Sequence, residues 1–132
     1  MGMPNIHAGF QLVLVVEDEV LIRMAMAAAL RELDLSVAEA RDATEALNIT
    51  HAGFVPDALL TDIRLPGPMD GLRLAALLES LFPNMRVFLT SGHMASSDLR
   101  LPMNFLEKPI HPRDAARHIK RALRPHAGVA QA

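Results

Sequence analysis

The chain has 132 residues, of which 51% are hydrophobic, and its formal net charge is -2. The length suits one domain, the apolar share excludes a disordered chain, and the charge predicts no direct binding to nucleic acid or to a membrane surface. The lack of cysteine excludes disulfides and thiolate metal sites, no apolar run approaches the ~20 residues of a membrane span, and no signal peptide is recognisable, so we expect a cytoplasmic protein.

The first half of the chain reads as strands alternating with helices. Residues 1–10 are expected to be a leader, and the apolar run at 12–16 predicts a buried strand. The Ala-, Leu- and Met-rich stretch 20–33 predicts a helix, and 35–40 a second strand. Asp42, with an acid three residues later, predicts a capped helix that extends to about Ala52. A third strand at 58–61 leads to Asp62 and a Pro/Gly turn.

The second half continues the alternation. A helix is expected at 71–81, a strand at 86–90 that Ser91 and Gly92 break, and at most a short helix at 96–101. A fifth strand at 103–106 and a helix at 112–123 follow, and 125–132 form a tail. This order predicts one α/β domain at 11–124. We expect a five-stranded parallel sheet of the doubly wound, flavodoxin-like type, with strand order 2-1-3-4-5 and helices on both faces.

Polar side chains gather where the predicted strands end. Glu17 and Asp18 follow the first strand, Asp62 the third, Thr90 ends the fourth, and Lys108 follows the fifth. In a doubly wound sheet these ends open on one edge, where three carboxylates would repel one another unless a cation joined them. Oxygen donors alone suit Mg²⁺, with Mn²⁺ as the alternative. A lysine and a hydroxyl beside them suit a phosphoryl group.

At these positions the chain resembles the receiver domain of two-component response regulators. The matching segments are Val15–Glu19, Leu60–Gly67, Asp70–Gly71, Leu89–Gly92 and Phe105–Pro109. Their order and their places at the strand ends make the resemblance specific. It covers residues 11–124.

The resemblance implies a role for each acidic residue. Asp62 would accept a phosphoryl group from a phosphohistidine. Mg²⁺ would be held by Glu17, Asp18, Asp62 and the backbone carbonyl of Arg64. The ion would offset the charge of the transferring group.

It also implies how phosphorylation is read out. Thr90 and Lys108 would contact the phosphoryl group, and the Lys108–Pro109 peptide bond would be cis. Thr90 would move toward the acyl phosphate and let Phe105 move inward, so that Thr90 and Phe105 form a conformational switch.

The implied function is a Mg²⁺-dependent signalling switch. Its phosphodonor would be a histidine kinase or a histidine phosphotransfer protein, and its output a downstream protein target; nucleic acid and membrane are not implied. Self-phosphorylation and autodephosphorylation would be its only chemistry, so it would not be an enzyme in the usual sense. A stand-alone regulator, a piece of a larger regulator or hybrid kinase, and a homodimer all remain open.

Two alternatives use the same fold. A phosphatase with an aspartyl nucleophile needs a general acid near Asp62, and none is evident in the sequence. A pseudo-receiver, which binds partners without phosphorylation, predicts loss of an acidic or lysine position, yet all are present.

Three features depart from the common pattern. Gly71 lies nine residues after Asp62, which makes that loop about one residue longer than in chemotaxis-type receivers, and only 18 positions separate Thr90 from Lys108. The 20–33 helix is apolar all round, which predicts burial on more than one side. We hypothesise that Met26 or Ala27 docks a partner helix bundle; the alternative is that alanine serves helix propensity alone.

Overall fold

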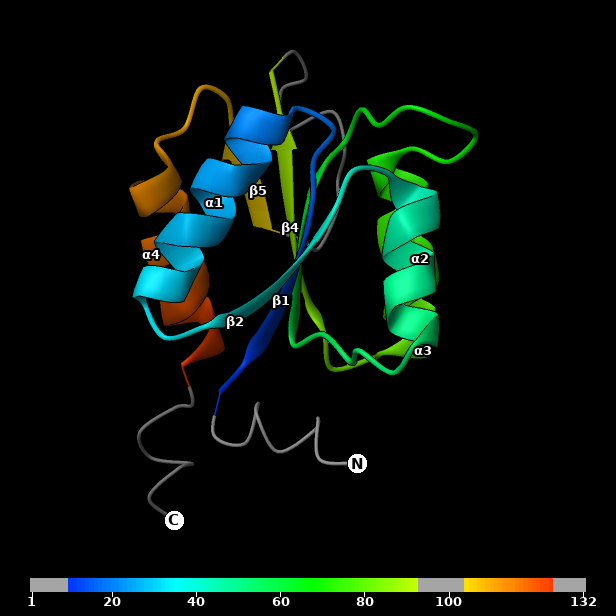
Figure 1. Cartoon of the computed structure of the whole chain (residues 1–132), viewed down its shortest axis with the longest axis horizontal. Helices are drawn as coiled ribbons and strands as arrows, with labels where there is room; N and C mark the ends of the chain where they lie inside the picture. The colour runs from blue at the N-terminus through cyan, green and yellow to red at the C-terminus, as the bar shows by residue number, and fades with distance from the viewer. Residues whose placement is uncertain (1–9, 93–103, 125–132) are drawn as a thin grey trace.

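The computed structural model describes residues 10–92 and 104–124 and contains one parallel sheet with helices on both faces (Figure 1). Its strand order is β2-β1-β3-β4-β5, so the predicted doubly wound, flavodoxin-like fold is confirmed. The strands are β1 Leu12–Val16, β2 Ser36–Ala40, β3 Ala58–Asp62, β4 Arg86–Ser91 and β5 Asn104–Glu107. The helices are α1 Val20–Glu32, α2 Ala43–His51, α3 Gly71–Leu81 and α4 Pro112–Leu123. None of the helices in this described part of the chain is both long and apolar enough to cross a membrane.

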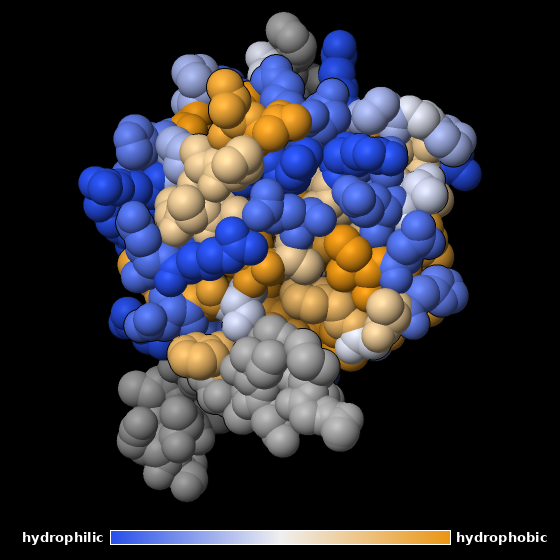
Figure 2. Space-filling view, viewed as in Figure 1, coloured by the Kyte–Doolittle hydropathy of each residue, from blue (hydrophilic) through white to orange (hydrophobic). Residues whose placement is uncertain are grey.

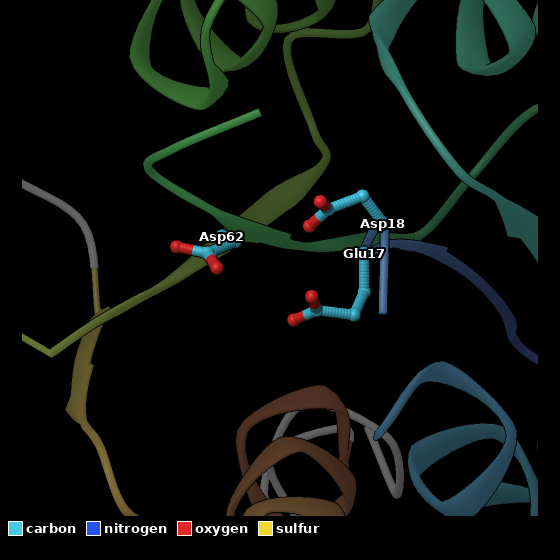
Figure 3. A group of neighbouring side chains, drawn as sticks. All are labelled: Glu17, Asp18 and Asp62. Atoms are coloured by element: carbon cyan, nitrogen blue, oxygen red, sulfur yellow. The ribbon is translucent and has the colours of Figure 1, made fainter. Parts of the chain in front are cut away.

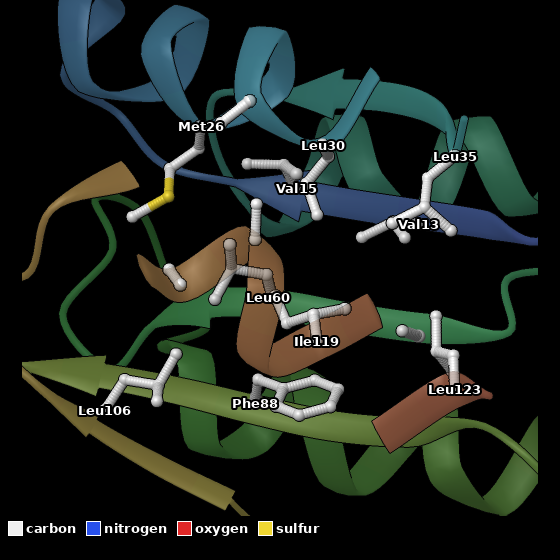
Figure 4. Packing of buried hydrophobic residues seen from close by; sticks show 14 residues of the cluster. Val13, Val15, Met26, Leu30, Leu35, Leu60, Phe88, Leu106, Ile119 and Leu123 are labelled. Atoms are coloured by element: carbon white, nitrogen blue, oxygen red, sulfur yellow. The ribbon is translucent and has the colours of Figure 1, made fainter. Parts of the chain in front are cut away.

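Successive side chains of each strand alternate between two hydrophobic layers, as the pleat of a strand requires. Val13 and Val15 face the layer formed with α1 and α4, where Leu60 and Phe88 join them (Figure 4). The intervening Leu14 faces the opposite layer, under α2 and α3. Burial on both faces explains why the central strands read as continuous apolar runs. Packing on both faces therefore fixes the positions of the residues at the carboxyl-terminal edge of the sheet.

The strands extend further toward that edge than the sequence predicts. Asp62 is the last residue of β3, and Ser91 pairs with Glu107 in the ladder between β4 and β5. The prediction that Ser91 breaks its strand is therefore wrong, because backbone pairing continues beneath polar side chains. The helices predicted at 71–81 and 112–123 are confirmed. The leader at 1–9, the helix predicted at 96–101, Met103 and the tail at 125–132 lie outside the described residues.

Helix α1 is buried on one side only, so the predicted burial on more than one side is wrong. It packs beside α4, and its outer face leaves Leu21 80% exposed and Met24 54% exposed. Met26 and Ala27, the predicted docking residues, are instead 5% and 0% exposed. They turn toward the sheet because they lie on the inner stripe of the helix. Ala27 therefore cannot touch a partner.

Candidate functional site

Three carboxylates meet at the carboxyl-terminal edge of the sheet. Glu17 and Asp18 follow β1, and Asp62 ends β3 (Figure 3). One oxygen from each lies within 4.8 Å of the others. Glu17 and Asp62 are buried, at 5% and 9% exposure, whereas Asp18 is exposed. The predicted convergence of the three residues is present in the structure.

Lys108, the residue after β5, reaches the carboxylates. Its Nζ lies 2.6 Å from Oδ2 of Asp62 and 3.6 Å from Oε1 of Glu17. Its backbone N–H donates to the carbonyl of Ser91 at 2.9 Å, which ties the residue to β4. The Lys108–Pro109 peptide bond is cis, in agreement with the resemblance.

The other oxygen of Asp62 is also held. The backbone N–H of Arg64 donates to Oδ1 at 3.1 Å, so both oxygens of the carboxylate have a donor. The Arg64 side chain is exposed beside the site. Its backbone carbonyl remains a predicted ligand of the cation.

Burial and charge shift two pKa values in the site. Burial raises the pKa of Glu17 above its ordinary value of 4.5, against the hydrogen bond from the backbone of Glu19 and the charge of Lys108. Burial alone would lower the pKa of Lys108, but the hydrogen bond to Asp62 and the charges of Glu17 and Asp62 outweigh it, and this pKa is raised. Lys108 is therefore held as a cation, while Glu17 is held ionised only at a cost.

The donor set suits a hard divalent cation. Its three residues supply only carboxylate oxygens, and they converge from two adjacent strands. Mg²⁺ takes one or two carboxylates together with water or phosphate oxygens, which leaves room for a phosphoryl group. The chemistry of these residues therefore fits the predicted Mg²⁺, with Mn²⁺ as an alternative.

Thr90 lies directly beside Asp62. The two residues are partners in the register of β3 and β4, and the N–H of Ile63 donates to the carbonyl of Thr90 at 3.0 Å. Thr90 is buried, and Phe105 lies one strand further, beside Leu89. Phe105 is half-buried against the core under α2 and α3. The two predicted switch residues thus occupy neighbouring strands.

A close contact fixes the backbone of Asp62 to α3. The N–H of Gly71 donates to the carbonyl of Ile63 at 2.8 Å, and a Cβ at Gly71 would lie 1.9 Å from the carbonyl oxygen of Asp62. Asp70 caps the helix by accepting from the N–H of Arg73 at 2.9 Å. The long loop between Asp62 and Gly71 therefore returns to pack directly on the site. Sequence spacing marks Gly71 but does not reveal this contact.

An apolar groove of about 550 Å³ opens beside the carboxylates. Its polar end includes Asp62 and Lys108, and its apolar walls come from α1 and from the segment between β5 and α4. The wall residues include Leu21, Ile22, Ala25, Met26, Pro109 and Ile110. Figure 2 shows apolar atoms gathered over the first turns of α1. Sequence reasoning singled out α1 but not the side that carries the exposed apolar surface.

Comparisons with known proteins agree with this geometry. The family model described as "Response regulator receiver domain" matches residues 13–120. The chain is 35% identical over 120 residues to the positive alginate biosynthesis regulatory protein of Pseudomonas aeruginosa, an alignment that covers 86% of this chain and 48% of that protein. It is 33% identical over 122 residues to the sensor kinase CckA of Brucella abortus, covering 88% of this chain and 13% of that protein. The chain thus spans about half the length, or less, of these curated relatives.

A solved structure has a similar fold. The CheY-like response regulator receiver domain protein of Methanospirillum hungatei superposes with a TM-score of 0.76 at 27% identity. The match covers 86% of this chain and 94% of that one. The likeness therefore extends over nearly the whole of that solved chain.

Proposed function

The chain belongs to the response regulator receiver domain family, and we propose that its Asp62 accepts a phosphoryl group from a phosphohistidine donor in a reaction that requires a divalent cation. One observation carries the proposal: the Asp62 carboxylate lies within 4.8 Å of two other carboxylates while Lys108 donates to it at 2.6 Å. This combination places a nucleophilic carboxylate next to a positive charge and beside a candidate cation site. The chemistry at Asp62 is confined to its own phosphorylation and to the loss of that phosphoryl group.

The chain's own residues position the nucleophile and balance charge. An oxygen of Asp62 forms the new O–P bond as the N–P bond of the phosphohistidine breaks, and the imidazole keeps the electron pair and takes up a proton from solvent. Lys108 supplies a positive charge next to the oxygens of the transferring group. The hydroxyl of Thr90, from the neighbouring strand, donates to the same group. Burial of Asp62 at 9% exposure strengthens each of these interactions.

Glu17, Asp18 and Asp62 would hold Mg²⁺, or Mn²⁺, with the backbone carbonyl of Arg64 as a further ligand. When bound, the ion neutralises charge on the phosphoryl oxygens. The raised pKa of Glu17 supports this role, because a buried carboxylate that is held ionised at a cost gains most from a nearby cation.

The output of the phosphorylated state would pass through Thr90 and Phe105. Thr90 pairs with Asp62 on one side and Leu106 on the other, so a shift toward the acyl phosphate would be felt in β5. Phe105 is half-buried in that strand and packs against the core under α2 and α3. The proposed readout is a repacked surface at β5 that a downstream protein target recognises.

The phosphodonor, a histidine kinase or a histidine phosphotransfer protein, would dock over the groove. Its phosphohistidine has to reach Asp62, and the groove opens there. Leu21 at 80% exposure stands at the rim and suits contact with an apolar helix face. The docking surface proposed is therefore the outer face of α1 near Leu21, in place of Met26 and Ala27.

Phosphorylation can be tested with a small acyl phosphate and Mg²⁺. The wild-type chain is expected to gain the mass of one phosphoryl group, and to lose the gain when EDTA replaces Mg²⁺. The matched Asp62→Asn variant, which keeps the shape of the side chain, should gain none. Because the sequence contains no tryptophan or tyrosine, beryllofluoride binding is better followed by amide chemical shifts than by fluorescence.

The same experiment decides between the receiver and the pseudo-receiver. Equal mass gain in Asp62→Asn would place the modification elsewhere and contradict the proposal. A wild-type chain that gains no mass and shows no beryllofluoride response would favour a binding module that acts without phosphorylation.

A further inference from the structure

An arginine outside the carboxylate cluster reaches the turn that carries two of its members. Arg23 lies in the first part of α1, and its Nη1 donates to the backbone carbonyl of Glu17 at 2.9 Å. Side chains of a helix tilt toward its N-terminus, so Arg23 points back at the turn that precedes the helix. A cation near a helix N-terminus opposes the helix dipole. The unfavourable position of Arg23 must therefore be offset by other interactions of its side chain.

The guanidinium is anchored on the other side by the sheet. Its Nε lies 3.4 Å from Oε1 of Glu39 in β2, and the Arg23 side chain is 17% exposed. Arg31, about two turns further along α1, approaches the second oxygen of Glu39 at 3.2 Å and also donates to the carbonyl of Val37. Arg23 thus links the carbonyl of Glu17 to a carboxylate of β2, the strand that pairs with β1.

Two further hydrogen bonds, together with that of Arg23, hold the turn that contains Glu17 and Asp18. The N–H of Glu17 donates to the carbonyl of Ala40 at 3.0 Å, and the N–H of Glu19 donates to Oε2 of Glu17 at 3.1 Å. The peptide groups on either side of Glu17 are therefore both tied down, one to β2 directly and one through Arg23. A carboxylate on a fixed backbone keeps its distance to Asp62, which belongs to a different strand.

We infer that Arg23 is a positioning residue of the cation site, which holds the Glu17–Asp18 turn against β2 through Glu39 and so presets the carboxylates for Mg²⁺. The inference rests on the proposed function, because it assumes that the cluster binds a divalent cation. The effect is one of position more than of charge, since the Glu39 carboxylate beside Arg23 offsets its positive charge. Groups that orient metal ligands change metal affinity when they are removed.

The test is Mg²⁺ affinity, measured by isothermal titration calorimetry on the full chain without phosphodonor. Arg23→Gln should weaken Mg²⁺ binding about tenfold, the lower end of the effect of removing an orienting partner. Arg23→Lys keeps the charge, but one ammonium group cannot span both Glu17 and Glu39, so it should still bind more weakly than wild type. The matched control is Arg31→Gln, which removes the other partner of Glu39 and leaves the contact to Glu17 intact; its affinity should equal that of wild type.

Hydrogen exchange of the metal-free chain provides a second readout. The amides of Glu17 and Glu19 should exchange faster in Arg23→Gln and in Glu39→Gln than in wild type or in Arg31→Gln. The Glu39→Gln variant keeps the test available should Arg23→Gln fold poorly, because it removes the charge that anchors Arg23 and leaves the arginine in place.

Each outcome decides. Wild-type Mg²⁺ affinity in Arg23→Gln, full recovery in Arg23→Lys, or equal loss in Arg31→Gln would overturn the inference and leave the proposed function standing. A wild-type chain that binds no Mg²⁺ would overturn both.

Discussion

At the scale of single residues, the burial of Glu17 at the candidate cation site makes its charge unfavourable for the stability of the metal-free chain. Its side chain is buried beside Asp62, and burial raises its pKa above 4.5. A raised pKa in the folded state means that the folded chain ionises Glu17 less readily than the unfolded chain does. Its contribution to stability is therefore full below pH 4.5 and is lost as the pH rises through the raised value. The site retains an unfavourable charge that a bound cation would relieve.

We expect Glu17→Gln to stabilise the metal-free chain at neutral pH while it weakens Mg²⁺ binding by at least about tenfold. The gain in unfolding free energy should be about 0.5–2 kcal/mol, the range for relieving an unfavourable functional charge, and it should shrink as the pH falls toward 4.5. Urea unfolding followed by circular dichroism, in EDTA across this pH range, measures it.

Glu19→Gln is the matched control, because Glu19 is exposed and lies outside the carboxylate cluster. Its stability should remain within about 0.5 kcal/mol of wild type. A Glu17→Gln variant less stable than wild type at neutral pH would show that the interaction with Lys108 outweighs the burial of the charge.

At the scale of elements, the start of α3 rests on the backbone of the candidate phosphorylation site. Gly71→Ala would gain about 1 kcal/mol of helix propensity, but its Cβ would lie 1.9 Å from the carbonyl oxygen of Asp62. At that distance the backbone of α3 and the backbone of Asp62 would have to move apart. The cost of this overpacking should exceed the gain in helix propensity, so we expect the free energy of unfolding to fall by about 1–3 kcal/mol. Urea unfolding measures the loss, and the phosphorylation rate with a small acyl phosphate should fall with it.

Gly92→Ala serves as the control for this contact. Among the residues that the structure describes, the nearest atom to a Cβ there would be the Cβ of Lys108 at 3.9 Å, an ordinary contact. Its unfolding free energy should stay within about 0.5 kcal/mol of wild type. Equal stability of the two alanine variants would mean that α3 can shift away from Asp62 without cost.

The outer face of α1 yields a prediction that separates docking from chemistry. Leu21→Glu places a charge at a side chain that is 80% exposed, so stability should hardly change. Phosphotransfer from a histidine phosphotransfer protein that phosphorylates the wild-type chain should slow about fivefold or more, because a charge in an apolar contact costs at least about 1 kcal/mol. Phosphorylation by a small acyl phosphate should be unchanged.

Ala28→Glu is the matched control on the same helix, because Ala28 is exposed but does not line the groove. It should transfer at the wild-type rate. Equal slowing in both variants would point to the charge of the helix as a whole, and unchanged transfer in Leu21→Glu would remove the groove from the docking surface.

Predictions from the sequence are most accurate where one physical signal dominates. Continuous apolar runs located the central strands, and the helices predicted at 71–81 and 112–123 match α3 and α4. The exposed side of α1 could not be predicted, because apolar helix-forming residues such as alanine and methionine occur on both of its faces. The sequence therefore shows no difference in hydrophobicity between the buried and the exposed side. The contacts of Arg23 with Glu39 and of Gly71 with Asp62 depend on how strands and loops meet in space. Spacing along the chain does not encode that.

At the scale of the whole molecule, the candidate site is a meeting of strand ends. Its groups come from β1, β3, β4 and β5, four neighbours in one sheet. No single segment could hold them, so the fold and the site form together. The predicted doubly wound topology placed these residues at one edge, and the strand order confirms that topology.

Because the cluster exists only in the folded chain, Mg²⁺ should stabilise the whole molecule. A ligand that binds only the folded state raises the unfolding free energy by about 2.7 kcal/mol at a hundred times its dissociation constant. Urea unfolding in MgCl₂ and in KCl of equal ionic strength separates specific binding from general screening of charge. We expect a rise in MgCl₂ alone that follows the logarithm of its concentration.

The expected rise should vanish in Asp18→Asn. Asp18 is the exposed member of the cluster, so its replacement should remove a ligand while the core beneath stays packed. In KCl the variant should therefore unfold at nearly the wild-type urea concentration. An equal response of wild type and Asp18→Asn to MgCl₂ would mean that the ion binds elsewhere on the folded chain, and the carboxylate edge would then need another explanation.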